Sequence, residues 1–341
     1  MVTVGMLSHR KDPRTVFKSY AYAAAAKMEG VNFYFFSPAR VNFNERNIKG
    51  WVYENGQWIQ KKVPFPDVIY NSSPPQTEKQ EEIVDRLREI IPFTSHSIGN
   101  KLDVYYKIKN ANLFAQYLIP YLEITKPQDV LKFLTHYNEI VIKPLNGHQG
   151  QNILYISGNG KRINVQQNKK TLVMNRTEFE NFIKDLIKNM SYFAQVFINS
   201  KTKRGLATHF RLHTQKNAEG EWRLTTIFPC IAQQGIVANL SNGGYTMMFE
   251  EFIKQEFDNE YYNIKRYLEV FSTNFTKHFD SLYDNRLDEL GIDVGLDKNH
   301  KIWIFEVNWR PGTPPTFSLE LDVAKQMIRY ARYLAEKKQI R

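Results

Sequence analysis

Two acids and an asparagine in the last sixth of the chain have the right types and spacing to hold a metal ion. They are Asp293, Glu306 and Asn308, and they lie on two short apolar segments, 291–297 and 302–308, separated by a polar break. This pattern predicts a β-hairpin that carries all three side chains. Carboxylate and amide oxygens suit a hard cation such as Mg²⁺, which commonly keeps other coordination positions for water and substrate phosphate. The set therefore predicts phosphoryl chemistry.

The register of this hairpin decides whether the three side chains meet. A turn centred between Asn299 and His300 would pair residues whose numbers sum to 599, which places Asp293 across from Glu306. Because alternate side chains of a strand share one face, Asn308 would join them. The large apolar residues would point to the other face: Ile292, Val294, Trp303, Phe305 and Val307. An ordinary half-exposed hairpin with acids on its wet face is the alternative.

A second group of residues is suited to binding phosphate. Lys143 stands near the end of a predicted strand, 140–144, and a glycine-containing loop separates it from the next strand, 152–156. Backbone amides of such a loop can fold over phosphates, and the lysine adds a positive charge beside them. The loop residues are Gly147, His148, Gln149 and Gly150. The alternatives are that Lys143 is only a charge on an edge strand and that the glycine-containing loop is an ordinary hairpin turn.

Composition places the chain among large globular proteins. With 341 residues, 42% of them hydrophobic and 14% aromatic, it is long for one domain, so two or three packed units are expected. The single cysteine, Cys230, excludes an intrachain disulfide and a cysteine-built zinc site. No stretch approaches the roughly 18–20 apolar residues that span a bilayer, and no signal-peptide pattern opens the chain. A soluble cytoplasmic protein without a membrane partner is the expectation.

The net charge of +11 raises the question of an anionic partner. The lysines and arginines are scattered, and no helix-turn-helix, zinc-finger or aromatic RNA-recognition pattern accompanies them. We therefore expect no specific nucleic-acid partner and attribute the charge to nucleotide phosphate and solubility. The basic stretch Lys325–Arg341 predicts an amphipathic helix with one solvated face.

The elements that must position these residues follow from the hydrophobic pattern. Alternating strand and helix patterns before residue 96 predict an open α/β unit. Its loop Asn71–Pro75 follows the carboxyl end of the strand 67–70. Open α/β sheets commonly bind ligands at this end of their strands. The alternative is that the proline-rich loop only connects two elements. A helix over Lys101–Leu118, capped near Ser97 or Asn100, is predicted to open the second unit.

Two histidines and an arginine alternate along another predicted strand. His209, Arg211 and His213 would share one face of that strand. Two histidines without a third nearby ligand are more often a polar sheet face or substrate contacts than a transition-metal site.

The order of these features resembles the ATP-grasp superfamily. The features follow one another in a fixed order over residues 97–320. First comes a lysine, then a second lysine on a strand that leads into a glycine loop, and then a strand that contains a glutamine. A hairpin that carries two acids and an asparagine is the last of them. Several segments are similar, more narrowly, to the endospore coat-associated YheC/YheD group of that superfamily. They are Asn100–Lys101, Leu122–Thr125, Val141–Pro144, Asn239–Gly244 and Trp303–Asn308, with Pro66–Asn71 extending the similarity into the N-terminal unit.

The resemblance implies an α/β (α+β) protein with the ATP-grasp fold. An N-terminal open α/β domain, residues 1–96, would precede two α+β subdomains that sandwich the nucleotide. The central subdomain, 97–191, would supply the phosphate-covering loop, and the C-terminal subdomain, 192–341, the metal-binding hairpin.

The resemblance also implies roles for single residues. Lys101 and Lys143 would hold the nucleotide phosphates, with Lys107 competing for the first of these positions, and the loop from Gly147 to Gly150 would close over them. The adenine pocket would be lined by Gln195, Val196, Phe197 and Ile198. Magnesium, or alternatively manganese, would be held by Asp293, Glu306 and Asn308. Arg211 is the first candidate to bind a carboxylate or the γ-phosphate, and Arg310 the second.

Family members of known activity activate a carboxylate as an acyl phosphate, which an amine then attacks. The resemblance therefore implies an ATP- and Mg²⁺-dependent carboxylate–amine ligase with small-molecule or peptide substrates, and a spore association. Three departures leave a second hypothesis open, a non-catalytic nucleotide-binding or structural spore protein. His209 stands where an aspartate is usual, and the segment Phe228–Ala232 lacks an expected arginine. Ser72 stands where a second arginine is often found. Kinase-like phosphoryl transfer is a third alternative.

Overall fold

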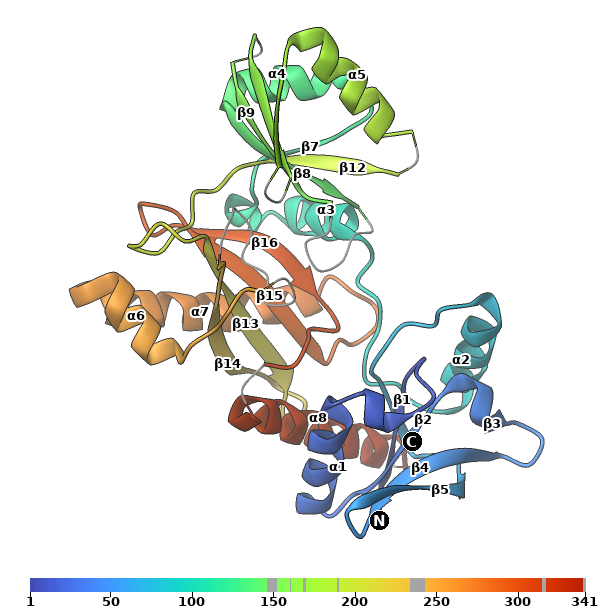
Figure 1. The fold of residues 1–341 in the computed structure, drawn as a ribbon. Coiled ribbons are helices and arrows are strands. Elements are labelled where there is room, and N and C mark those ends of the chain that lie inside the picture. Colours follow the sequence, from blue (N-terminus) through green and yellow to red (C-terminus); the bar gives the residue numbers. More distant parts are fainter. Residues whose placement is uncertain are drawn as a thin grey trace.

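Three α+β units make up the protein, and the C-terminal sheet lies between the other two (Figure 1). The structure is a computed structural model that describes residues 1–145, 152–159, 161–167, 170–188, 190–233, 243–314 and 317–339. The mixed α and β organisation agrees with the predicted fold class. Within the ranges just given, no helix combines the length and the apolar composition that crossing a membrane requires.

The N-terminal unit is a six-stranded sheet in the order β3-β4-β2-β1-β6, with β5 paired to β4. Its central strands are apolar runs buried on both faces, as parallel sheets require, and β1, β2 and β6 are parallel. The carboxyl ends of β1 and β6 lie side by side, with Leu7 paired to Asn71. The elements are β1 (Thr3–Leu7), α1 (Lys18–Met28), β2 (Asn32–Phe36), β3 (Val41–Asn42), β4 (Asn47–Glu54), β5 (Gln57–Pro64), β6 (Val68–Asn71) and α2 (Glu78–Ile90), with 3₁₀ turns at Pro13–Thr15 and Pro38–Arg40.

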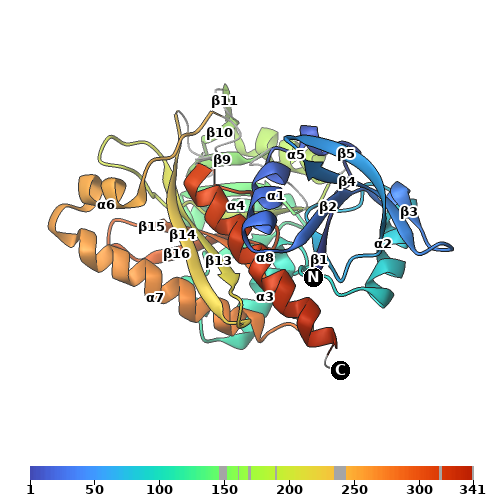
Figure 2. The ribbon, with the colours of Figure 1, turned by 90° about the horizontal axis from the view of Figure 1, so that it is seen from below.

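The last helix of the chain returns to this N-terminal unit. Figure 2 shows α8 (Phe317–Gln339) lying beside α1. Small side chains such as Ala324 and Ala331 let the two helices approach closely, and Ile328 completes their shared core. The predicted C-terminal subdomain, 192–341, therefore sends its final helix into the core of the first unit. The predicted domain boundaries remain predictions.

The central unit is an antiparallel sheet in the order β11-β10-β9-β8-β12-β7. Helices α4 and α5 cover it, and their apolar residues form one core with the sheet, Val130, Leu134, Phe179 and Ile183 among them. The elements are β7 (Tyr121–Glu123), α4 (Pro127–Tyr137), β8 (Glu139–Pro144), β9 (Leu154–Gly158), β10 (Ile163–Gln167), β11 (Lys170–Met174), α5 (Arg176–Leu186) and β12 (Tyr192–Val196).

Helix α3 (Lys101–Ala111) joins the central unit to the C-terminal sheet. Asn100 caps it as predicted, because its Oδ1 accepts from the amide of Asp103 at 3.1 Å while Asp103 Oδ2 accepts from the amide of Asn100 at 2.8 Å. The predicted helix end at Leu118 is wrong. Asn112 leaves the helical conformation with φ of 65°, and only a 3₁₀ turn, Ala115–Tyr117, follows.

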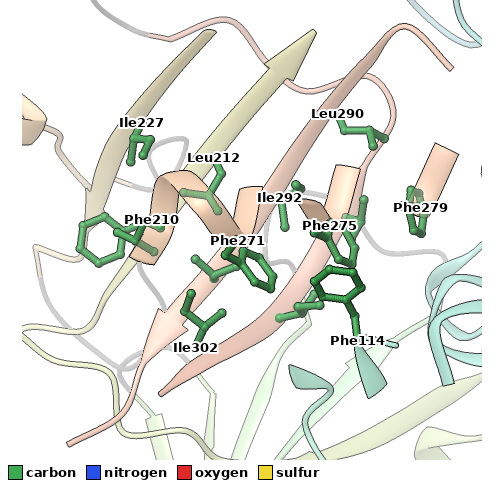
Figure 3. Packing of buried hydrophobic residues seen from close by; sticks show 14 of the residues in the cluster. Phe114, Phe210, Leu212, Ile227, Phe271, Phe275, Phe279, Leu290, Ile292 and Ile302 are labelled. Carbon is green, nitrogen blue, oxygen red and sulfur yellow. The ribbon is translucent and has the colours of Figure 1, made fainter. Parts of the chain in front are cut away.

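The C-terminal sheet has the order β14-β13-β15-β16. One face is apolar and packs on α7, where Phe271, Phe275 and Phe279 repeat every four residues and meet Leu212 and Ile292 (Figure 3). The other face carries polar side chains and forms the candidate site. The elements are β13 (Thr208–Lys216), β14 (Trp222–Ile231), α6 (Phe249–Phe257), a 3₁₀ turn (Asp258–Glu260), α7 (Tyr261–Asp280), β15 (Glu289–Leu296) and β16 (Ile302–Asn308).

Candidate active site

The hairpin β15–β16 sets the predicted metal ligands opposite each other, but by a route that the sequence did not reveal. Asp293 pairs with Glu306 as predicted. Nearer the turn, however, Leu296 pairs with Ile302, so the paired numbers sum to 598 rather than 599. The predicted turn centre is therefore wrong by half a residue. A β-bulge at Phe305, where the register shifts, restores the predicted pairing at the acids.

The bulge also changes which face the aromatic side chains occupy. Trp303 and Phe305 were predicted on the apolar face, and this is wrong: both lie on the face of Asp293. Trp303 pairs with Gly295, and a Cβ atom at Gly295 would overlap the Phe305 ring. One extra residue inverts the alternation, so Ile302 and Ile304 fill the core instead.

Asp293 is buried and is held by cationic or polar groups. Arg211, its cross-strand partner on β13, donates from Nη2 to Oδ2 at 2.9 Å and from Nε to Oδ1. His209 Nε2 lies 3.7 Å from Oδ1, and Asn308 Nδ2 donates to Oδ2 at 3.5 Å. Gly291 makes room, because a Cβ atom there would lie 3.1 Å from the Arg211 side chain.

The charges around Asp293 shift the pKa values of its two neighbours in opposite directions. Burial lowers the pKa of His209, and the nearby cations Arg211 and Lys143 lower it further, although Asp293 opposes them. Burial also acts to lower the pKa of Arg211, but the Asp293 carboxylate outweighs it and raises that pKa above its ordinary value. His209 is therefore neutral and Arg211 charged at neutral pH.

Glu306 faces a lysine from α3. Lys101 Nζ lies 3.4 Å from Glu306 Oε1, and the capping of α3 at Asn100 fixes where this lysine emerges. Lys107 lies elsewhere on the same helix. Its Nζ donates to the carbonyl of Leu282 at 3.2 Å and lies 4.6 Å from the centre of the Tyr283 ring. The structure thus brings Lys101, and not Lys107, to the hairpin.

Lys143 reaches the same place from the central sheet. Its Nζ donates to Gln195 Oε1 at 2.8 Å, Gln195 Nε2 donates to the Tyr105 hydroxyl, and that hydroxyl donates to the Ile304 carbonyl at 2.7 Å. Burial lowers the pKa of Lys143 to about 8, with Lys101 adding to the effect and Glu306 opposing it. A chain of hydrogen bonds therefore ties the lysine of one sheet to the backbone of the other.

The end of β12 lies where the two sheets meet. The amides of Val196 and Phe197 donate to the carbonyls of Pro120 and Glu139, each at 3.0 Å, and the Phe197 ring meets Tyr155 edge-on at 4.9 Å. The Ile198 carbonyl accepts from the amide of Ser200 at 2.9 Å. The adenine-lining role of Gln195 to Ile198 remains a prediction.

Some predicted residues are not described. Gly147, His148, Gln149 and Gly150 lie outside the described residues, as do the first four residues of Asn239–Gly244. The segment Phe228–Ala232, which lacks the expected arginine, forms a small apolar cluster with Ala207. Burial raises the pKa of its thiol, Cys230, to about 12, which agrees with an inert side chain.

The structure assembles six of the predicted residues from four strands, β8, β13, β15 and β16, and one helix, α3. They are Lys101, Lys143, Arg211, Asp293, Glu306 and Asn308. In the part of the chain that the structure describes, no three histidine, cysteine or acidic side chains converge as metal ligands. The predicted set has two carboxylates and one amide, so this finding does not bear on it. The site offers two lysines and an arginine for anionic oxygens beside oxygen donors for a cation.

Sequence reasoning missed the junction between this sheet and the N-terminal unit. His213 lies on the face predicted for it, and its Nε2 shares a hydrogen bond of 2.7 Å with Glu289, a partner that was not foreseen. Lys18 reaches the same region from α1. No spacing rule links these positions, because they meet only when β6, α1 and β15 pack together.

Known proteins resemble this chain in sequence and in fold. A family model described as YheC/D like ATP-grasp matches residues 90–334. Endospore coat-associated protein YheD of Bacillus subtilis (strain 168) is 25% identical over 323 residues, which cover 89% of this chain and 70% of that protein. Endospore coat-associated protein YheC of the same organism is 24% identical over 331 residues, covering 92% and 89%.

Solved structures share the fold at low sequence identity. D-alanyl-alanine synthetase A from Vibrio cholerae has a TM-score of 0.61 at 11% identity, covering 98% of this chain and 96% of that one. A RiPP-associated ATP-grasp ligase from Chryseobacterium gregarium, solved with ADP and a leader and core peptide, has a TM-score of 0.54 at 12% identity, covering 97% of each chain. These likenesses confirm the predicted ATP-grasp fold.

Proposed function

The chain belongs to the YheC/D-like ATP-grasp family, and from this premise we propose that it is an ATP- and Mg²⁺-dependent ligase that joins a carboxylate to an amine. One observation carries the proposal. Lysines from the central unit and carboxylates from the C-terminal hairpin meet in one cluster, with Lys101 3.4 Å from Glu306 and Lys143 under the electrostatic influence of both Glu306 and Asp293. Such a cluster is suited to a metal-bound triphosphate.

The donor set fits a divalent cation with a preference for oxygen. Asp293, Glu306 and Asn308 offer only oxygen donors to a metal, and the first two are paired across the strands while Asn308 contacts Asp293. These three residues would hold Mg²⁺, or Mn²⁺ in its place. When bound, the metal would neutralise charge on the phosphates.

The chemistry proposed is acyl activation followed by amide formation. An oxygen of the substrate carboxylate attacks the γ-phosphorus of ATP, and the bond from that phosphorus to the β,γ-bridging oxygen breaks, releasing ADP and leaving an acyl phosphate. The amine nitrogen then attacks the acyl carbon. The carbon–oxygen bond to phosphate breaks, inorganic phosphate leaves with the electron pair, and the amine proton passes to solvent.

The residues of this chain would bind and orient the reactants. Lys101 and Lys143 would neutralise the transferring phosphoryl group as charge develops on it. Arg211 is held charged in the site by Asp293 and is the candidate to bind the reacting carboxylate or the γ-phosphate.

The substrates are proposed from chemistry and from the relatives. Small-molecule or peptide carboxylates and amines, amino acids among them, are the substrate classes that agree with the printed names of the fold neighbours, which include a D-alanyl-alanine synthetase and a ligase solved with a peptide. The names of the sequence relatives support an association with the endospore coat. A cytoplasmic place of action is part of the same proposal.

One observation favours a second candidate, a nucleotide-binding or structural spore protein without turnover. Arg211 occupies both carboxylate oxygens of Asp293, and the segment near Cys230 lacks the arginine that the family resemblance led us to expect. A site whose acid is already neutralised binds a metal less readily.

The first experiment is isothermal titration of ATP into the full-length protein with and without Mg²⁺, followed by ADP detection against a library of amino acids and peptides. The ligase proposal expects Mg²⁺-dependent binding and ADP release that the correct acid stimulates. Binding without turnover on any substrate would favour the second candidate, and no nucleotide binding would contradict both nucleotide-dependent proposals.

Two lysines on α3 provide a matched pair for this titration. Lys101→Met should weaken ATP binding about 10- to 100-fold, because it removes a charge-assisted contact to phosphate. Lys107→Met removes the same charge from the same helix, but its ammonium group contacts Leu282 and Tyr283. It should change the ATP dissociation constant less than about twofold. Equal effects of the two substitutions would contradict the placement of the triphosphate.

A further inference from the structure

A second polar cluster lies at the other end of the same sheet face, where the C-terminal sheet meets the N-terminal unit. We call it the junction cluster, and it consists of Lys18, Asn71, His213, Asp288, Glu289 and Arg310. Asn71 ends β6 beside the end of β1, at the carboxyl edge of the parallel strands. This is the edge at which open α/β sheets bind ligands.

Arg310 interacts electrostatically with residues on both sides of this edge. Its guanidinium is influenced by Tyr70 on one face of the N-terminal sheet and by Arg88 of α2, which covers the other face. It is also influenced by Asp288, whose carboxylate accepts from Ser95 Oγ at 3.2 Å. Since Tyr70 and Asn71 are the last two residues of β6, Arg310 lies near the end of that strand.

Two members of the junction cluster have buried polar atoms without partners. Asn71 is 0% exposed, and neither its Oδ1 nor its Nδ2 makes a hydrogen bond. The Nε and Nη1 atoms of Arg310 are likewise buried and unpaired, while the guanidinium stacks 3.7 Å from the centre of the Trp309 ring. Buried polar groups of a folded protein are nearly always satisfied. These atoms therefore point to a ligand.

Two cations of the cluster lack a direct ionic contact. Burial lowers the pKa of both, that of Arg310 to about 9, while Glu289 and Glu320 act on Lys18, and Asp288 on Arg310, in the opposite direction. Glu289 shares a hydrogen bond with His213. Burial and the neighbouring Glu289 raise the pKa of Asp288 well above its ordinary value, which disfavours the charged form of this group. Among the described residues, neither Lys18 nor Arg310 has a carboxylate oxygen within 4 Å. Lys18 instead donates to the Tyr70 hydroxyl and the Ser72 carbonyl, both at 3.4 Å.

Lys18 and Arg310 also act on each other as like charges. An anion bound between them would remove this repulsion and would satisfy the unpaired N–H groups of the guanidinium. Asn71 offers an amide donor at the same edge. A cation is less suited to this place, because the charged form of Asp288 is disfavoured and Glu289 already shares a hydrogen bond with His213.

The junction cluster is close to the proposed reaction centre. Arg310 follows the predicted metal ligand Asn308 by two residues, which span at most about 7 Å of chain. His213 follows Arg211 by two residues on β13, a rise of roughly 7 Å. A small molecule can therefore reach from one end of the polar face to the other.

We propose that the junction cluster binds a second anionic group of the acid substrate, so that the ligase takes a small acid with two anionic groups, one that reacts near Arg211 and one held by Arg310, Lys18 and Asn71. This inference rests on the proposed function. A carboxylate is the group we assign to the junction, and a phosphate shares its chemistry.

The test measures two bindings on the full-length protein. ADP with Mg²⁺ is titrated first. Dicarboxylates from succinate to adipate, L-glutamate, butyrate, the monoamide of glutarate and inorganic phosphate are then titrated in the presence of ADP and Mg²⁺. A dicarboxylate should bind at least about tenfold more tightly than butyrate and the monoamide. Preferential binding of inorganic phosphate that Arg310→Met weakens would assign the junction to a phosphorylated acid instead.

Arg310→Met should weaken dicarboxylate binding about 10- to 100-fold and leave ADP binding unchanged within about twofold. Arg88→Met is the matched control, because Arg88 is the neighbouring cation and already has Asp85 at 2.6 Å. It should change neither binding by more than about twofold. Asn71→Leu is the second variant should Arg310→Met fail to fold, and it should weaken dicarboxylate binding without altering ADP binding.

Three results would overturn the inference: no acid of the panel binds, dicarboxylates and butyrate bind equally, or the Arg310 and Asn71 variants bind the dicarboxylate as the unmodified protein does. Each is separable from failure of the proposed function, which shows as absence of ADP binding in the first titration or as absence of substrate-stimulated ADP release in the assay described above.

Discussion

The two ends of the polar face on the C-terminal sheet differ in how their charges are satisfied. At the hairpin end, Arg211 neutralises Asp293 and Lys101 lies 3.4 Å from Glu306. At the junction end, Arg310 and Asn71 keep buried polar atoms without partners. The charged groups of the hairpin end are paired with one another, whereas polar atoms of the junction end are left without partners. The hairpin end must therefore exchange protein contacts for a ligand, whereas the junction end can bind one without breaking any.

The largest effect should come from removing a carboxylate at the hairpin end. Glu306→Gln keeps the size and polarity of the side chain but deletes the charge that faces Lys101 and Lys143. We expect substrate-stimulated ADP release to fall about 100- to 1,000-fold, the range seen when one electrostatic contact is lost from a reaction centre. Steady-state ADP assays measure it.

Asp297→Asn is the control for this loss. It removes a carboxylate from the same hairpin, but Asp297 only accepts hydrogen bonds from Trp303 Nε1 and the turn amides. Its rate should stay within about threefold of the unmodified protein. If Glu306→Gln kept full activity, the assignment of Glu306 to the metal would be wrong.

The next effect separates the two ends by stability. Arg211→Met leaves the buried carboxylate of Asp293 without its bidentate partner, so the free energy of unfolding should fall by about 3 kcal/mol. Arg310→Met removes a cation that has no acidic partner, and it should lower the free energy of unfolding by less than about 1 kcal/mol or raise it. Urea denaturation of both variants compares them directly.

A double substitution sharpens this comparison. Arg211→Met combined with Asp293→Leu removes both charges of the pair, and it should recover much of the stability that Arg211→Met alone loses. Equal losses in Arg211→Met and Arg310→Met would show that the two ends do not differ in charge balance.

The hairpin end could be predicted from the sequence because local rules govern it. Alternation along two strands placed Asp293 opposite Glu306, and a helix cap placed Lys101 at the start of α3. The bulge at Phe305 could not be predicted, since a single inserted residue carries no compositional signal. It moved two aromatic rings to the other face, and it offset the error in the predicted turn, so that the acids pair as predicted.

The junction end could not be predicted because it depends on contacts between remote parts of the chain. Lys18, Asn71 and Glu289 come from three elements whose approach is set by packing, above all by α8, which joins α1 in the core of the N-terminal unit. The sequence did indicate the loop after β6 as a candidate ligand site, because that loop follows the carboxyl end of a strand. Its partners on the C-terminal sheet had no local signature.

The smallest effect is a pH dependence of nucleotide binding at the hairpin end. Burial lowers the pKa of Lys143 to about 8 in the folded protein, from 10.5 in an ordinary lysine. Between these values the folded protein binds fewer protons than the unfolded chain, so the contribution of this group to stability rises with pH in that window. Nucleotide binding has the opposite sign, because phosphate requires the charged lysine and the charged fraction falls above pH 8.

We therefore expect the ATP dissociation constant to rise about tenfold between pH 7 and pH 9, as measured by titration calorimetry with Mg²⁺. In Lys143→Arg the guanidinium stays charged throughout this range, so the dependence should flatten. If ATP binding were independent of pH in both proteins, Lys143 would not contact phosphate, and the hairpin end would owe its anion affinity to Lys101 and Arg211 instead.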